Sequence, residues 1–341
     1  MASRLLALLL LLSCAPFAAA KRRAPKLPDA WDVLRESLEP VDASYQGEVL
    51  VDVYKGQLAT TREMSVRVAD GGRYRREILG EDGRPSQLIV SDGKTEWIYD
   101  RARNKVWEGE PADPYYKRLG PDDEFDLLSE NYDALVSSST PVAGHAAWLV
   151  ELRSKEGGRL ERRLWIDKRK GLVLQSQMFL PDGQLATEMK FTKLEYRKSS
   201  AKTPFMFKIP PGAKIVKRTE PDFMALDEAK SAAGLEPKTP AWLPSGYVFE
   251  SLDVLPRGGR KILHFRFSDG VNVLSLFQCP PHVTLDFGGE NAKQIDAGFG
   301  RATTAWTPEG RVLGWSKAGS KFLLVGPLSP EQLARVAESV R

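Results

Sequence analysis

The chain has 341 residues, with 49 lysines and arginines against 45 aspartates and glutamates, so its formal charge is only +4 at pH 7. A charge this close to balance gives no reason to expect a nucleic-acid partner. Two cysteines cannot supply a disulfide framework, and three histidines cannot supply much of a metal site. At roughly 150 residues per domain, the length predicts about two domains.

The first twenty residues have the features of a secretory signal peptide. Arg4 precedes the apolar run Leu5–Leu12, which is too short for a bilayer span of about 20 residues. Alanines at 18–20 form a small-residue cleavage site. We therefore expect cleavage after Ala20 and a periplasmic mature chain. The sequence around Cys14 also resembles a lipoprotein cleavage box, so lipid anchoring through Cys14 is a minor alternative.

Short alternating strands dominate the region from about 45 to 110, after a short amphipathic helix at Asp29–Leu38. In Tyr45–Tyr54 the alternate positions 49, 51 and 53 are valine, and they alternate with Glu48, Leu50 and Asp52. This period of two is typical of antiparallel strands with one buried face. Asp-Gly pairs, such as Asp70-Gly71, tolerate the positive φ angles of tight hairpin turns. The region is thus predicted to be a meander of hairpins.

A helical patch and further strands complete the predicted first domain. Spacings of three and four predict that one helix carries Phe125, Leu128, Tyr132, Leu135 and Val136. Strands are then predicted at Ala147–Leu152, Arg162–Asp167, Leu172–Leu180 and Leu185–Tyr196. The expected fold class is α+β, with one large antiparallel sheet and helices on one face.

A second, smaller α+β domain is predicted at 222–341, after a first domain at 21–215 and a linker at 216–221. Phe223–Ala233 is expected to be a helix that ends at Gly234. Ser329, Pro330 and Gln332 predict a capping box at the start of a last helix. Six strands are expected between these helices, at Tyr247–Leu255, Lys261–Phe267, Val271–Gln278, Ala302–Trp306, Arg311–Lys317 and Lys321–Val325.

Motifs of catalysis and cofactor binding are absent from the sequence. The three histidines have no metal-ligand spacing, and no nucleophile elbow, dinucleotide fingerprint or phosphate loop occurs. Cleavage after Ala20 leaves Cys279 as the one thiol, which we expect to be buried and inert, without a disulfide. We therefore predict a protein that is not an enzyme and has no cofactor, no metal and no nucleic-acid partner.

Large apolar side chains on the predicted strands are the remaining signal, and they have two interpretations. Most of them can fill the core between sheet and helices. Alternatively, a strongly curved sheet with few covering helices leaves an apolar groove for acyl chains or an apolar peptide. The candidate groove residues are Val49, Val51, Val53, Trp97, Tyr99 and Trp165.

Several stretches together resemble one family. Pro240–Tyr247, which reads PAWLPSGY, resembles the signature that opens the C-terminal domain of the RseB/MucB family of periplasmic sigma-E regulators. Phe267–Gly270, with the apolar strand that follows, is similar to a strand pair of that domain. In the first domain, Leu164–Asp167 and the turn at Asp182-Gly183 resemble a strand–turn–strand unit shared with the LolA/LolB lipoprotein carriers.

The resemblance implies a fold, a function and a partner. The first domain would be a LolA-like half-barrel with helices on the concave side of its sheet. The protein would bind the periplasmic segment of a transmembrane anti-sigma factor, and lipid, lipoprotein or lipopolysaccharide would relieve that binding during envelope stress. A periplasmic lipoprotein or lipid carrier of the LolA type is the alternative function.

Overall fold

The computed structural model describes residues 26–39, 41, 43–55, 58–111, 121–197, 203–217, 224–257, 259–285, 287, 292–307 and 310–341. The predicted signal peptide, with Ala20 and Cys14, lies outside these residues. Within the ranges given, no helix is both long enough and apolar enough to cross a membrane.

The first domain is built on a twelve-stranded sheet in the order β12-β6-β5-β4-β3-β2-β1-β11-β10-β9-β8-β7. Its neighbours pair antiparallel except β12 and β6, which are parallel. The meander predicted for 45–110 is confirmed as β1 to β6. The strands are β1 Tyr45–Lys55, β2 Leu58–Ala69, β3 Arg73–Leu79, β4 Pro85–Asp92, β5 Glu96–Asp100, β6 Lys105–Gly109, β7 Tyr132–Ser138, β8 Ala147–Ser154, β9 Leu160–Asp167, β10 Val173–Phe179, β11 Leu185–Tyr196 and β12 Lys214–Lys217.

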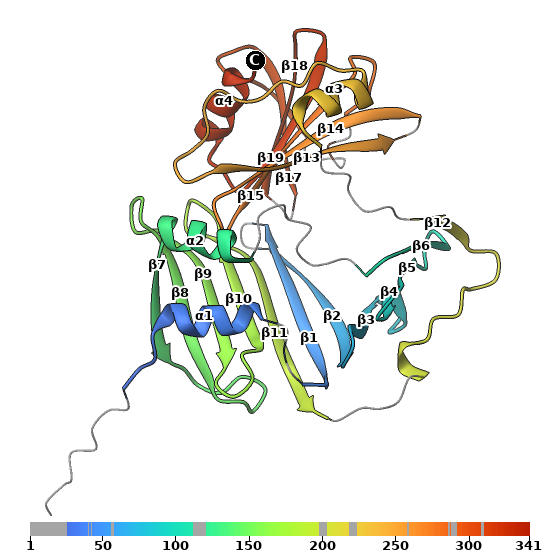
Figure 1. The fold of residues 1–341 in the computed structure, drawn as a ribbon, viewed down its shortest axis with the longest axis vertical. Helices are drawn as coiled ribbons and strands as arrows, with labels where there is room; N and C mark the ends of the chain where they lie inside the picture. The colour runs from blue at the N-terminus through green and yellow to red at the C-terminus, as the bar shows by residue number, and fades with distance from the viewer. Residues whose placement is uncertain are drawn as a thin grey trace, which may run out of the picture.

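Two helices cover one end of this sheet (Figure 1). Helix α1, Ala30–Leu38, begins after Asp29, whose carboxylate accepts from the amides of Trp31 and Asp32. Helix α2 spans Pro121–Asn131. Both pack their apolar sides onto β7 to β10, where they form one buried cluster of Val33, Leu34, Phe125, Leu128, Tyr132, Val150, Leu152 and Ile166.

The predicted helix through Tyr132, Leu135 and Val136 is wrong in its second half. Helix α2 ends at Asn131, and these three residues lie in β7. Tyr132 and Val136 face the helices, whereas Leu135 points away and is 54% exposed. Pairing with β8 along the whole of β7 decides the conformation here, because cross-strand packing outweighs a five-residue helical spacing.

The second domain contains a seven-stranded antiparallel sheet in the order β13-β14-β15-β19-β18-β17-β16. The six predicted strands are confirmed, and the sequence reading missed the short, exposed β16. The strands are β13 Val248–Arg257, β14 Arg260–Ser268, β15 Val273–Cys279, β16 Lys293–Asp296, β17 Arg301–Thr307, β18 Gly310–Lys317 and β19 Ser320–Gly326.

Helices α3, Leu226–Ala233, and α4, Pro330–Ser339, pack against this second sheet. Helix α3 ends at Gly234 as predicted, but it begins at Leu226 rather than Phe223. Phe223, the predicted first residue, lies outside the described part of the chain. The capping box of Ser329 and Gln332 at the start of α4 is confirmed. Together the two domains confirm the α+β class.

Candidate functional site

The strand register divides the first sheet into two faces. We call the face that carries α1 and α2 the inner face, and the opposite one the outer face. Directly paired residues of neighbouring strands project to the same side of a sheet. Val49, Val51 and Val53 therefore lie on the inner face, because the row through Val51 continues by Met189 and Ser176 to Leu164, which packs in the cluster with the helices. Leu50 and Asp52 lie on the outer face.

The six candidate groove residues do not share a face. Trp97 pairs with Val90 of β4. The same row continues through Arg75 and Arg67 to Gln46, which lies on the outer face of β1. Trp97, and Tyr99 two residues further along β5, therefore lie on the outer face. Trp165 pairs with Gln175, whose row runs through Lys190 to Leu50, so it also belongs to the outer row. The structure thus separates Trp97 and Tyr99 from the three valines, whereas Trp165 packs against the cluster that contains Val49.

The inner face of β1 to β6 has an apolar centre, and its rows also carry two arginines and other polar residues, among them Gln87, Glu96, Asp100 and Lys105. Its rows contain residues that sequence reasoning missed: Met64, Val66, Ile78, Ile89, Ile98 and Trp107. Arg62 lies beside Val51, and Arg76 lies between Val66 and Ile89. Both arginines are exposed, and the described residues provide neither with a carboxylate partner. The alternation of apolar and polar residues within β2 to β6 is the sequence signal for these residues. It assigns them to the inner face only when the register of each hairpin is also known.

Coverage of the inner face differs between the two halves of the sheet. Figure 1 shows α1 and α2 over β7 to β10, with β1 to β6 curving away on the other side. Val49 is buried, whereas Val51, Val53 and Met64 are half-buried. The face can therefore contact an apolar ligand through its aliphatic side chains and an anionic group through Arg62 or Arg76.

A buried polar network joins the two domains where α2 meets β7. The hydroxyl of Tyr132 donates to Oδ2 of Asp269 at 2.7 Å, and Nδ2 of Asn272 donates to the same hydroxyl at 3.3 Å. Nδ2 of Asn131 donates to the carbonyl oxygens of Gly246 and Asp269, both at 3.1 Å. We call this contact the domain junction. Its second-domain residues come from the two stretches on which the family resemblance rests.

Charges at the domain junction are largely removed from water. Burial, followed by the nearby carboxylate of Asp269, raises the pKa of the Tyr132 hydroxyl far above its ordinary value. Burial also lowers the pKa of Arg162, whose guanidinium donates to the carbonyl of Val271 at 3.2 Å. A desolvated network of this kind requires one fixed geometry, because each lost partner leaves a buried polar atom unsatisfied.

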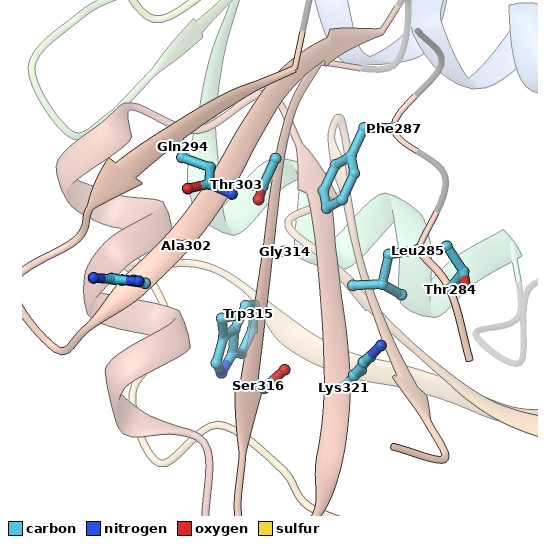
Figure 2. A pocket seen from close by; sticks show the side chains of 11 residues that line it. Thr284, Leu285, Phe287, Gln294, Ala302, Thr303, Gly314, Trp315, Ser316 and Lys321 are labelled. Carbon is cyan, nitrogen blue, oxygen red and sulfur yellow. The ribbon is translucent and has the colours of Figure 1, made fainter. Parts of the chain in front are cut away.

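The second domain has a hollow of about 600 Å³ on its sheet (Figure 2). Its floor includes Gly314 of β18, and a Cβ atom there would stand 2.3 Å from Phe287, so only glycine allows that ring to approach. Nζ of Lys321 donates to the carbonyl of Val283 beside it. Arg301, Gln294 and Thr303 add polar groups, so this hollow suits a polar ligand better than an acyl chain.

Chemistry-bearing groups elsewhere are few. No group of three or more metal-ligating side chains occurs within the part of the chain that the structure describes. Cys279 is a buried thiol at the end of β15. The fold and the surfaces above define a two-domain α+β protein organised around a curved apolar sheet.

The comparison with protein families identifies this class further. The model of the MucB/RseB N-terminal domain matches residues 40–210, which is half of the chain. The chain therefore belongs to the MucB/RseB family. A curated relative, the sigma factor AlgU regulatory protein MucB of Pseudomonas aeruginosa, is 27% identical over 153 residues. That match covers 44% of this chain and spans less than half, 45%, of the relative's own length.

Solved structures share the fold of both domains. The crystal structure of MucB in complex with MucA(peri) has a TM-score of 0.58 at 21% identity and covers 92% of this chain and 98% of that one. The Pseudomonas aeruginosa MucA/MucB complex gives a TM-score of 0.58 at 20% identity, over 92% and 99% of the two chains. MucB alone gives 0.53 at 21% identity, over 92% and 97%.

Proposed function

We propose that this protein is a periplasmic regulatory protein that binds the exported segment of a transmembrane anti-sigma factor. The observation that carries the proposal is the family match over residues 40–210. It is supported by the partly aligned relative, which is a sigma factor regulatory protein. The fold of both domains is shared with MucB as it occurs in complexes with MucA, which is why we expect both domains to take part.

We further propose that the inner face of β1 to β6 receives acyl chains. Val51, Val53 and Met64 offer a half-buried aliphatic surface, and the exposed Arg62 can pair with an anionic head group. A ligand that binds the partner-free state of the regulator better than the partner-bound state must weaken the partner's binding by the same coupling free energy. Acyl-chain binding and partner binding would then be linked within one molecule.

Binding to the anti-sigma segment is tested with the full chain and the exported segment of the anti-sigma factor encoded by the same organism. Isothermal titration should give a saturable complex, and an anionic lipid micelle should lower its affinity. No binding, together with acyl lipid that co-purifies with the chain, would refute the regulator and favour the LolA-type carrier.

The acyl-chain surface is tested with two neighbouring residues of β1 that point to opposite faces. Val51→Gln places a polar amide on the inner face, and we expect about tenfold weaker uptake of an apolar fluorescent probe, since burying an aliphatic side chain is worth about 1.5 kcal/mol. Leu50→Gln is the control on the outer face, and uptake should stay unchanged. Equal effects of the two variants would exclude the inner face as the site.

A further inference from the structure

Residues 203–217, which we call the strap, lie against the outer face of the first sheet. The strap begins with the short helix η1, Thr203–Phe205, and ends with β12. In Figure 1 it follows β11 in the chain and rises past β3 to β6 on the way to the second domain. The strap is thus the part of the connection between the two domains that packs against the first domain.

Two aromatic rings anchor the strap. Phe205 is 3% exposed, and the guanidinium of Arg73 lies 5.4 Å from its ring centre. The ring of Phe207 stacks on Trp97 at 5.9 Å between centroids and lies 6.4 Å from Tyr99. Trp97 and Tyr99, which the sequence suggested as groove residues, therefore hold the protein's own connecting segment.

Polar contacts and a strand fix the other end of the strap. The amide of Lys214 donates to the carbonyl of Asn104 at 2.9 Å, and Nδ2 of Asn104 donates to the carbonyl of Pro211 at 3.4 Å. Strand β12 then pairs parallel with β6, and Lys217 forms an ion pair with Glu108.

The strap is a single layer with one side in water. Met206 is 69% exposed, although it stands between the two anchoring rings, and Ile209 and Ile215 are exposed as well. The anchorage therefore depends on few side chains, and neither Phe205 nor Phe207 belongs to the large buried clusters of the two domains.

We propose that the strap sets the length of the tether between the two domains and thereby holds the domain junction together. With the strap docked, eight residues separate Lys217 from Leu226 at the start of α3, and these span at most about 30 Å. Without it, 29 residues separate Tyr196 from Leu226, and the maximum span rises to about 100 Å.

The tether length determines how often the junction residues meet. The effective concentration of one domain at the other falls roughly as the −3/2 power of tether length. The change from 8 to 29 residues lowers it about sevenfold. Release of the strap therefore increases the open fraction of the Tyr132–Asp269 junction about sevenfold, with no change in the junction's own contacts.

The test uses a thiol as a probe of junction opening. Val271 packs against the cluster beneath α2, so Val271→Cys, in a chain with Cys14→Ser and Cys279→Ser, reports exposure of the junction through its labelling rate. The changes Phe205→Ala and Phe207→Ala, combined with Val216→Pro to break the pairing of β12 with β6, should increase that rate about sevenfold. Met206→Ala, on the same strap but in water, is the matched control and should leave it unchanged.

A second variant keeps the anchors and changes only the tether. Eight glycine and serine residues inserted after Lys217 double the tether and should increase labelling about threefold by the same law. This variant also serves if the triple variant fails to fold. Labelling that stays unchanged with the insertion would overturn the proposal, as would an unchanged rate in a folded triple variant.

Discussion

Gly270 offers the most direct test of how closely the two domains pack. It has a φ angle of +93°, and a Cβ atom added to it would stand 2.8 Å from both the Cα and the amide nitrogen of Leu128 in α2. These are backbone atoms of the other domain, so no side-chain rotation can relieve the contact. Gly270→Ala therefore perturbs the domain junction itself.

The magnitude has two parts. An alanine at a positive φ angle costs about 1–2 kcal/mol through its own backbone strain. Forcing a methyl group into a closed contact costs about 1–3 kcal/mol more, because the domains must move apart and the buried hydrogen bonds of Tyr132 with Asp269 and with Asn272 must lengthen. We expect a total loss of about 2–5 kcal/mol in the free energy of unfolding.

Gly183→Ala is the matched control for this change. Gly183 also follows an aspartate in a hairpin turn and has a φ angle of +81°, but nothing lies within 4 Å of an added Cβ atom. Urea denaturation followed by tryptophan fluorescence should give a loss of about 1–2 kcal/mol for the control. Equal losses in the two variants would refute the close packing of Gly270 against Leu128, because backbone strain alone would then explain both.

Three further predictions concern single groups. Tyr132→Phe should lower the free energy of unfolding by about 1.5–3 kcal/mol, because it removes a buried hydrogen bond to a carboxylate, whereas Tyr99→Phe, which removes a half-buried hydrogen bond to the neutral amide of Asn104, should cost less than about 1 kcal/mol. Since the folded-state pKa of Tyr132 is raised above its ordinary value of 10.0, its contribution is complete below that pH and is lost at higher pH. Stability measured from pH 9 to 11 should therefore decline more steeply in the native protein than in Tyr132→Phe; parallel curves would exclude this role. Cys279, at 3% exposure, should react with a thiol reagent at least about 100-fold more slowly in the folded than in the urea-unfolded chain, and a fast native reaction would place it at the surface.

The placement of the groove candidates shows where local pattern stops being informative. The alternation of Val49, Val51 and Val53 is a property of one strand, and it predicted correctly that the three share a face. Whether Trp97 shares that face depends on four successive hairpin registers between β1 and β5. A shift of one residue in any of them would reverse the result, because side chains alternate with a period of two.

The end of α2 illustrates a second limit. Phe125 and Leu128 of α2 have a helical spacing, and in the sequence this spacing continues to Tyr132 and Val136, which lie in β7. The same residues fit a strand equally well, and only the presence of β8 as a pairing partner decides between the two conformations.

The sequence by itself determined the α+β class, the order of the hairpins, the cap of the last helix and the family, because these follow from turn residues, apolar periodicity and short motifs close together in the chain. The tertiary structure decided which faces those residues share and what covers them. Asp269-Gly270 is a turn by its local chemistry, but it becomes a domain contact only against Leu128 and Tyr132. Trp97 and Tyr99 form a surface by their strand, but they become an anchor only when Phe207, distant in sequence, packs on them. Contacts of this kind depend on how distant segments meet in space, and no local pattern of residues specifies that meeting.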